Sequence, residues 1–525
     1  MPSSSPNTKT ASDPSGRDRL GRNVAFAWGG YMVNVISGFI VPRLISDHLG
    51  QTTLGIWDFS WSFVSYFGLV QLGLGGSISR YVASYRANND VEGLNRSVST
   101  IAYFLRSVGW LAFVLAVISA WCLLPLFGPR LGDDLETARL VLLFQGTEIA
   151  IIIPLSVYGS VIAGCHCWDL QNIVNSVANG LVAVGMITVL LLGGGLPAIA
   201  LVHCVTMIGT ELVRWRLVKR VCPELVIKRH FASWSTFVEQ ARYGIKTLVP
   251  SVADLLSNHA LSLLIVAFIG PVSLAIFSRS RSLMNTLRTL AAKFGMIVVP
   301  IASELHARND RAALQETLLA TPAVISSLVL PLLFAMGILG NELMRLWMGE
   351  PFVFPGMIPI LAIGTYATLV QEPVWSLLSG MNRHGRIALA KLIAACVSAT
   401  LLAVGLWGFH WGLLGAALCF ALPQVLVDGC ITPWYACRVL CVSKRSYLLG
   451  TFVRPMLCVS PFAVALVACT RLVPGYPVWA AGVLVFGGVV SGLMYLGWLI
   501  PMSMRKRGIE FFLRVLPKRS MKTCA

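Results

Sequence analysis

Charged residues are scarce in this chain, and that scarcity excludes most classes of soluble protein. Asp, Glu, Lys and Arg make up 12% of the 525 residues, whereas hydrophobic residues make up 56%. A soluble globular protein carries about 25% charged residues, because its surface must face water. The composition therefore predicts a membrane protein.

Several catalytic and nucleotide-binding motifs are also missing. The chain has no Gly-x-x-x-x-Gly-Lys-Ser/Thr loop, no His-Glu-x-x-His and no Gly-x-Ser-x-Gly, and these motifs mark phosphate-binding loops, zinc proteases and serine hydrolases. The longest polar connections, near 219–238 and 501–525, leave little room for a hydrophilic domain. We expect neither ATP-driven transport nor enzymatic activity, and no cofactor.

The thirteen cysteines form no framework. Most are single residues inside apolar segments, such as Cys122, Cys204 and Cys396, where they act as small hydrophobic side chains. Cys165 and Cys167 flank a histidine, but no second ligand pair at zinc-site spacing accompanies them. We expect no metal site.

Long apolar runs of about 18 to 30 residues recur along the chain, and about 20 helical residues cross a bilayer core. Residues 1–21 are polar and lack the apolar middle of a signal peptide, so we expect a disordered cytoplasmic tail there. The sequence predicts an all-α polytopic protein with about fourteen transmembrane helices. The predicted spans are 22–46, 54–84, 98–128, 137–164, 171–193, 197–219, 239–269, 271–303, 313–347, 357–381, 386–408, 411–439, 450–470 and 475–500.

The basic residues are distributed asymmetrically across these spans. With the N-terminus inside, the tails and inward loops hold 28 of the 41 Lys and Arg, and the outward loops hold only Arg130 and Arg471. This asymmetry follows the positive-inside rule and predicts that both termini are cytoplasmic. The net charge of +18 is then an insertion signal rather than a sign of nucleic-acid binding. The basic tail at Arg505, Lys506 and Arg507 could in addition contact anionic lipid.

A segment near the N-terminus returns 220 positions later. Gly50 to Leu94 aligns without a gap to Gly270 to Leu314, which predicts one lobe built twice, as in transporters that work by alternating access. We predict an N-lobe at 22–219, a cytoplasmic linker at 220–238, a C-lobe at 239–439, two further helices at 450–500 and a basic cytoplasmic tail at 501–525. The matching pairs are Gly50/Gly270, Leu54/Leu274, Ile56/Ile276, Ser60/Ser280, Ser62/Ser282, Gly75/Gly295, Ala87/Ala307, Asn89/Asn309, Asp90/Asp310 and Leu94/Leu314.

Cations inside the predicted spans indicate the chemistry of the cargo. Each charge near the bilayer centre costs about 2.5 to 3.5 kcal/mol on insertion scales, so several on one helix need a wet cavity or an anionic partner. Guanidinium groups suit phosphate because their forked donors bind its oxygens in pairs. We therefore predict a cationic cavity for an anionic, phosphate- or diphosphate-bearing cargo. Its candidate residues are Arg279, Arg281, Asn285, Arg288 and Lys293 in the eighth span, with Arg242 and Lys246 in the seventh.

Acids and histidines inside the spans are candidates for ion coupling, because their charge can change between two transport states. These are Asp58, Glu148, Asp254, His259 and Glu372, together with His203. The competing interpretation pairs the acids with the cations as structural salt bridges.

A set of short segments stands out in the first hundred residues. They are Leu49-Gly50, Leu54-Gly55-Ile56-Trp57, Tyr66-Phe67-Gly68-Leu69, Leu72-Gly73-Leu74, Ser79-Arg80-Tyr81-Val82-Ala83 and Asn89-Asp90. With these segments, the chain resembles the polysaccharide exporters of the O-antigen flippase type, in the superfamily that also contains multidrug extruders and the lipid II flippase. The resemblance implies a core of two six-helix lobes with two appended helices in the bacterial inner membrane, and a cargo of oligosaccharide on polyprenyl diphosphate.

Two other functions compete with this one. A multidrug or cation antiporter would use acids and aromatic side chains, and the chain has 15 Trp and 24 Phe. A membrane-embedded glycan ligase or acyltransferase would need a larger outer loop than any found here. A glycan polymerase or glycosyltransferase of the same pathway is a conceivable partner of the flippase, which we expect to act as a monomer.

Overall fold

The computed structural model describes residues 15–71, 74–472, 477–495 and 497, and within these ranges the chain is helical and contains no strand. The predicted C-terminal tail with Arg505, Lys506 and Arg507, and most of the predicted N-terminal tail, lie outside the described residues. The protein is thus an all-helical polytopic membrane protein, as the sequence predicts.

Two compact units divide the chain. The first consists of Met1–Val252 with Gly270–Val272, and the second of Ala253–Ile269 with Ser273–Ala525. These units are defined by contacts between residues, whereas the predicted lobes are defined by a repeat in the sequence. The predicted lobe boundaries therefore stay a prediction.

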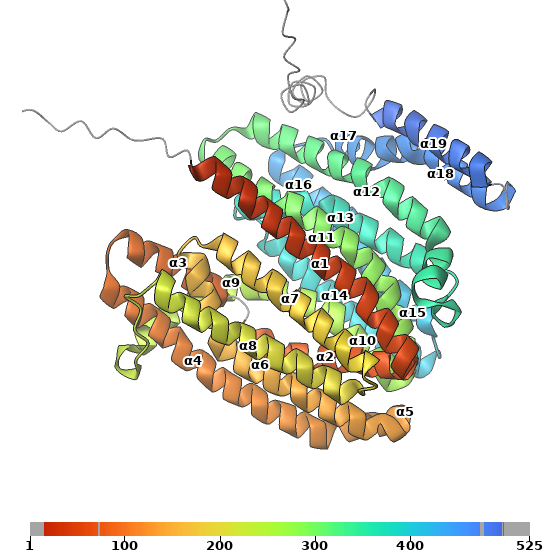
Figure 1. Ribbon diagram of the computed structural model, residues 1–525. Helices are drawn as coiled ribbons and strands as arrows, with labels where there is room; N and C mark the ends of the chain where they lie inside the picture. The colour runs from red at the N-terminus through yellow and green to blue at the C-terminus, as the bar shows by residue number, and fades with distance from the viewer. Residues whose placement is uncertain (1–14, 72–73, 473–476, 496, 498–525) are drawn as a thin grey trace, which may run out of the picture. The chain divides into compact units, whose positions relative to one another are not determined.

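The helices of the first half are drawn from red to yellow-green in Figure 1. They are α1 (Ser15–Leu49), α2 (Gln51–Val64), η1 (Ser65–Gln71), α3 (Leu74–Ala87), α4 (Val91–Ile118), η2 (Ser119–Leu123), η3 (Leu124–Phe127), α5 (Gly128–Leu131), η4 (Gly132–Asp134), α6 (Leu135–Gly164), α7 (Trp168–Leu191), α8 (Leu196–Val221), η5 (Arg229–Phe231) and α9 (Trp234–Leu255).

The second half continues with further helices, several of them interrupted by π-helical turns. They are η6 (Leu256–Ala260), α10 (Leu261–Phe268), α11 (Pro271–Ala307), α12 (Arg311–Met348), η7 (Glu350–Phe352), α13 (Met357–Gly380), α14 (Gly385–Gly408), α15 (Leu413–Gln424), η8 (Val425–Ile431), α16 (Thr432–Leu440), α17 (Lys444–Leu448), η9 (Leu449–Val453), α18 (Arg454–Leu472) and α19 (Pro477–Met494).

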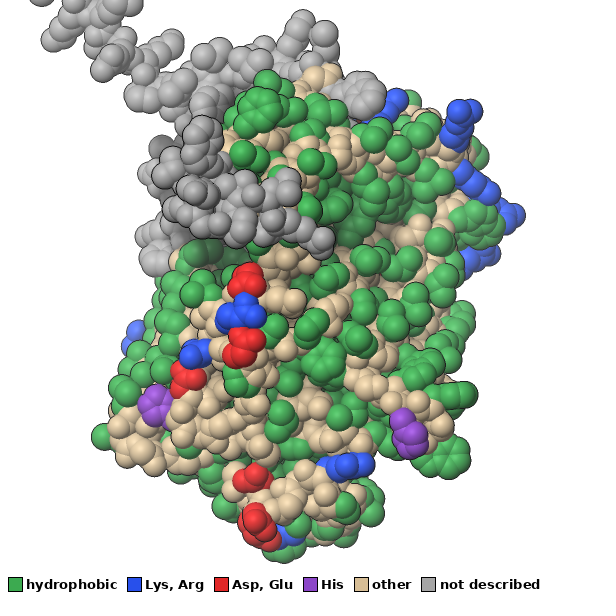
Figure 2. Space-filling view, turned by 90° about the vertical axis from the view of Figure 1, so that its right-hand side faces the viewer, with side chains coloured by type: hydrophobic (Ala, Val, Ile, Leu, Met, Phe, Trp, Pro, Cys, Tyr) green, Lys and Arg blue, Asp and Glu red, His purple; other side chains and the backbone are tan. Residues whose placement is uncertain are grey.

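Over the described residues, each predicted span falls on one helix or on a succession of helical segments, and the spans 54–84 and 475–500 also include residues outside the described ranges. Among the described residues, nine helical stretches are long and apolar enough to cross a membrane, and one of them, Val91–Gly164, holds two predicted spans. The face drawn in Figure 2 is covered mainly by hydrophobic side chains, with charged side chains in small groups. Such a surface suits lipid rather than water.

In the first unit, α6 packs against α4 and α8, and α1 packs against α7 (Figure 1). The core between α3, α4 and α6 includes Ile78, Val98 and Ile153, all fully buried. At Gly109 of α4, a Cβ atom would lie 2.4 Å from the carbonyl oxygen of Ala150, so only glycine allows the two helices to approach this closely.

In the second unit, α13 packs against α12 and α15, and α14 packs against α15. The appended helices α18 and α19 pack on each other, and α18 also contacts α12. The Phe462 backbone N–H donates to Ser491 Oγ at 3.1 Å, which joins α18 to α19 near the glycines of the latter. The two extra helices therefore belong to the packing of the second unit.

The sequence repeat is visible in the helix ends. Asn89 and Asn309 both have φ of 54°, in the left-handed region that asparagine tolerates. The residue after each caps the next helix: the Asp90 side chain accepts from Gly93 N at 2.8 Å, and that of Asp310 accepts from Ala313 N at 3.0 Å. The two halves thus use the same device to end one helix and begin another.

Candidate functional site

The predicted cationic residues of α11 lie at different depths within the second unit. Arg279 is buried, Arg281 and Arg288 are partly exposed, and Asn285 is exposed. Arg281 and Arg288 are two helical turns apart, with Asn285 between them, so these three share one face of α11. Arg279 is offset from that face.

Arg288 is held by a carboxylate at the end of α9. Its Nη2 donates to Asp254 Oδ1 at 2.7 Å, and the two side chains are 41% and 56% exposed. This is one of the pairings that the salt-bridge interpretation predicts. The guanidinium keeps exposed surface, so it can still meet another oxyanion.

Arg281 is positioned by a π-helical turn. Its Nη1 donates to the backbone oxygen of Asn258 at 2.8 Å, inside η6. Its guanidinium carbon lies 5.7 Å and 5.8 Å from the ring centres of Phe277 and Phe420. A π-helical turn shifts carbonyl groups out of the regular α-helical ladder and recurs at functional sites, and here such a turn supplies the acceptor that fixes an arginine.

A second ion pair lies nearby in the same unit. Lys391 Nζ of α14 is 3.1 Å from Asp428 Oδ1, and Asp428 is almost fully buried in η8. Thr368 Oγ1 donates to the other carboxylate oxygen, Oδ2, at 3.2 Å. Glu372 of α13 lies within electrostatic range of Lys391, Arg288, Asp428 and Asp254.

We call Asp254, Arg288, Glu372, Lys391 and Asp428 the unit 2 charge cluster. It combines three acids with two cations, so its net charge is −1 when all five are ionised. The sequence analysis misses Lys391 and Asp428. Both residues offered a signal, because Asp428 lies inside the predicted span 411–439 and Lys391 near the start of the predicted span 386–408.

In the first unit, Glu148 of α6 meets a histidine of α8. His203 Nδ1 and Glu148 Oε2 are 2.8 Å apart, and both side chains are mostly buried. The rings of Trp57 and Trp61 lie edge-on to the His203 ring, with centres 5.9 Å and 5.2 Å away. Asp58, next to Trp57 on α2, is half-buried.

Four predicted site residues remain, and the structure describes the side chains of two of them, Arg242 and His259. Arg242 is exposed on α9 and belongs to the first unit, so a ladder of cations joining it to α11 stays a prediction. The side chains of Lys246 and Lys293 lie outside the described residues. His259 lies in η6, and its Nδ1 has no hydrogen-bond partner among the described residues.

Solved structures share this fold at low sequence identity. A lipid II flippase, MurJ, matches with a TM-score of 0.69 and 12% identity, covering 93% of this chain and all of its own. A multidrug resistance transporter of the MATE family, in the MOP superfamily, matches with a TM-score of 0.65 and 14% identity, covering 78% of this chain and 94% of its own. The chain therefore shares the fold of these two transporters, and at this identity the likeness shows the fold alone.

The sequence itself matches more specific relatives. The “Putative O-antigen transporter” of Shigella flexneri is 21% identical over 440 residues, which cover 78% of this chain and 97% of that protein. Residues 20–306 match the family described as polysaccharide biosynthesis protein. This match extends over more than half of the chain, and the chain belongs to the polysaccharide biosynthesis protein family.

Proposed function

We propose that this protein moves an oligosaccharide on polyprenyl diphosphate from the cytoplasmic to the outer leaflet of a bacterial inner membrane, for the synthesis of O-antigen, capsule or exopolysaccharide. It does so as a transporter rather than an enzyme, with both termini in the cytoplasm. Its family, the name of its Shigella flexneri relative and its MOP superfamily fold support this proposal.

The observation that carries the proposal is the placement of Arg281 and Arg288 on one face of α11. Arg288 is bound to a single carboxylate at 2.7 Å and remains 41% exposed. A guanidinium has five donors, so a diphosphate can take those that Asp254 leaves unused. Arg281 and the amide of Asn285 extend the same surface along the helix.

The cargo and the driving ion would compete in the unit 2 charge cluster. Protonation of Asp254, or a cation bound beside it, weakens its hold on Arg288 and frees the guanidinium for the diphosphate. Return of the negative charge on Asp254 displaces the diphosphate again. Glu372 and Asp428 can also take up a proton or a cation, because the cluster has three acids and only two basic side chains. His259, Glu148 and Asp58 remain further candidates for ion coupling.

Reconstitution tests the proposal. The full chain is placed in vesicles with a fluorescent oligosaccharide on polyprenyl diphosphate, and a quencher that cannot cross the membrane reports the label in the outer leaflet. We expect faster exchange between leaflets than in protein-free vesicles, and slow exchange with Arg288→Ala. Equal exchange with and without the protein contradicts the proposal.

A second candidate, a multidrug or cation antiporter, is favoured by one feature of the first unit. The Glu148 carboxylate with His203, Trp57 and Trp61 combines an acid with aromatic faces, and this combination suits an organic cation. Efflux of a cationic dye from cells that express the protein, and its loss in Glu148→Gln, would support this function. Absence of efflux with normal glycan transport would exclude it.

A further inference from the structure

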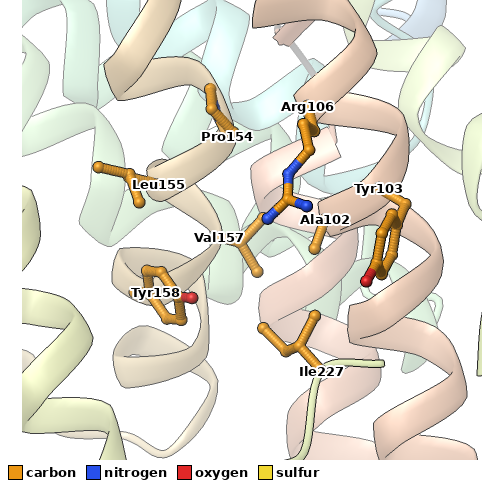
Figure 3. Close-up of a pocket in the computed structure, with 8 residues that line it drawn as sticks. All are labelled: Ala102, Tyr103, Arg106, Pro154, Leu155, Val157, Tyr158 and Ile227. Carbon is orange, nitrogen blue, oxygen red and sulfur yellow. The ribbon is translucent and has the colours of Figure 1, made fainter. Parts of the chain in front are cut away.

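A groove on the flank of the first unit contains an arginine that the proposed transport site does not use. Figure 3 shows the guanidinium of Arg106, from α4, between the side chains of Tyr103 and Tyr158, with Pro154 and Ile227 lining the cavity on opposite sides. The cavity has a volume of about 60 Å³. That volume suits one small group rather than a sugar chain.

Arg106 is a cation for which the described part of the chain supplies no ion-pair partner. Among the described residues, no carboxylate forms an ion pair with it, and its guanidinium carbon lies 5.2 Å from the ring centre of Tyr103. The Tyr158 ring faces the same space from α6 (Figure 3). A guanidinium between two phenol groups offers donors and no negative charge, so the groove is complementary to an anion.

The groove lies beside the basic segment that connects α8 to α9. The segment after α8 runs along the first turns of α4, because Val226 N donates to Asn95 Oδ1 at 2.8 Å and Lys228 N to Ser99 Oγ at 3.2 Å. This segment carries exposed Lys228 and Arg229. Trp234, which follows it, is 74% exposed. Exposed basic and Trp side chains together are typical of the membrane interface.

Thr100 Oγ1 accepts from Ser233 N of the connection after α8 at 3.1 Å. Arg106 is six residues beyond Thr100 on α4, about 9 Å along the helix axis at 1.5 Å per residue. Side chains on a helix point toward its N-terminus, so the Arg106 guanidinium returns toward the basic segment. Ile227 of that segment borders the same cavity. The guanidinium is therefore at headgroup depth.

The surface of α4 changes character beyond Arg106. Trp110, Phe113 and Val114 follow at i+4, i+7 and i+8 on the same face, and all three are exposed. An exposed apolar stripe of this kind contacts acyl chains in a bilayer. The groove thus has an anion-binding end and an apolar end, aligned as a phospholipid is.

We propose that this groove binds an anionic phospholipid of the cytoplasmic leaflet. Its phosphodiester accepts hydrogen bonds from Arg106 and the two tyrosine hydroxyls, and its acyl chains lie along Trp110 and Phe113. The bound lipid fills the surface between α4 and α6. This site is separate from the cargo residues on α11, and it rests on the proposed function only for the orientation that makes the leaflet cytoplasmic.

Native mass spectrometry of the purified full chain tests the site. The protein is equilibrated in detergent micelles with equal amounts of phosphatidylglycerol and phosphatidylcholine, and the retained lipids are counted. A cation at the headgroup level contributes about 1 kcal/mol, so we expect roughly fivefold preference for phosphatidylglycerol in the wild type. Arg106→Gln should abolish that preference, and Arg106→Lys should keep most of it.

Arg96→Gln is the matched control, because it removes the same charge from the same helix, α4. Arg96 already pairs with Glu92 at 2.5 Å. This variant should retain the wild-type preference. Size-exclusion and melting profiles show that each variant is folded. Equal retention of both lipids by the wild type, or an unchanged preference in Arg106→Gln, overturns the proposal. Displacement of phosphatidylglycerol by inorganic phosphate or polyprenyl phosphate also overturns it, because the site would then belong to a free anion or to the cargo.

Discussion

Arg288 Nη2 lies 2.7 Å from Asp254 Oδ1, and this contact joins α11 to the end of α9 within one unit. In the proposed function, this pair links the cation that binds the diphosphate to an acid that takes part in ion coupling. In the proposed function, the two interpretations of the intramembrane charges, cargo site and salt bridge, describe this same pair in two states.

The first prediction concerns this pair. Arg288→Ala removes the guanidinium, and a charge-assisted contact is worth about 1.5 to 3 kcal/mol, or roughly 10- to 100-fold in binding. We expect a fall of that order in transport of the lipid-linked oligosaccharide. Asp254→Asn should keep cargo binding but slow turnover, because Asn cannot take part in the exchange of charge. Transport in vesicles and cargo binding measure the two effects.

Arg308→Ala is the control for Arg288→Ala. Arg308 directly follows α11 and pairs with Glu304 at 2.7 Å, but both side chains are well exposed. An exposed pair of this type contributes about 0 to 1 kcal/mol, so transport should be unchanged. Equal transport by Arg288→Ala and Arg308→Ala would contradict the assignment of the site.

The second prediction concerns Lys391 and Asp428. Asp428 is almost fully buried, and Asp428→Asn leaves the Lys391 charge without its partner at 3.1 Å. Breaking a fully buried pair costs about 3 to 5 kcal/mol. Because the Lys391 side chain is 29% exposed, the loss here should be smaller, but the melting temperature in detergent should still fall. The double variant Lys391→Met with Asp428→Asn should recover most of the lost stability without recovering ion-coupled transport. Full transport in the double variant would show that the pair is only structural.

The third prediction follows from the repeat. Asp90→Ala and Asp310→Ala each remove an N-cap hydrogen bond, so each should lower the free energy of unfolding by about 1 kcal/mol. Chemical denaturation in micelles should show similar losses for the two variants. Asp133→Ala, an exposed acid outside the repeat, should stay within about 0.5 kcal/mol of the wild type. A loss at only one cap would indicate that the two halves are not equivalent there.

The fourth prediction concerns a thiol at the end of α6. A hydrogen bond from Cys222 and the nearby guanidinium of Arg86 lower the pKa of Cys165 below its ordinary value. The thiolate is the reactive form, so Cys165 should react with iodoacetamide at a lower pH than an ordinary thiol, whose pKa is about 8.5. Peptide mapping over a pH series measures this.

Cys222→Ala and Arg86→Gln should both move the Cys165 profile to higher pH, since each removes a group that stabilises the thiolate. Cys441, an exposed cysteine in the second unit, is the internal reference in every sample. A Cys165 profile that coincides with the Cys441 profile would contradict this account of the Arg86, Cys165 and Cys222 group.

Much of the fold follows from the sequence, because apolar runs fix the spans and local residues fix their ends. Asn89-Asp90 and Asn309-Asp310 end one helix and cap the next, and Gly50 and Gly270 both take the positive φ that their positions require. These signals act over a few residues, so they are readable without tertiary structure.

The site is less predictable, since its pairs come from distant parts of the chain. His203 meets Glu148 across 55 positions, and Lys391 meets Asp428 across helices that each look apolar. The π-helical turns η6 and η8, which position Asn258 and Asp428, have no sequence signature of their own. The Arg106 groove needs Ile227 of the connection after α8, whose course depends on its hydrogen bonds to α4.

The central claim is most directly tested in the native host with this gene deleted. Surface polysaccharide is measured together with the lipid-linked oligosaccharide in the cytoplasmic leaflet, and mass analysis of that precursor identifies the cargo. We expect that surface glycan is lost and that the precursor accumulates in the cytoplasmic leaflet. The wild-type gene should restore export, and the Arg288→Ala gene should not. Normal surface glycan without a trapped precursor would contradict it.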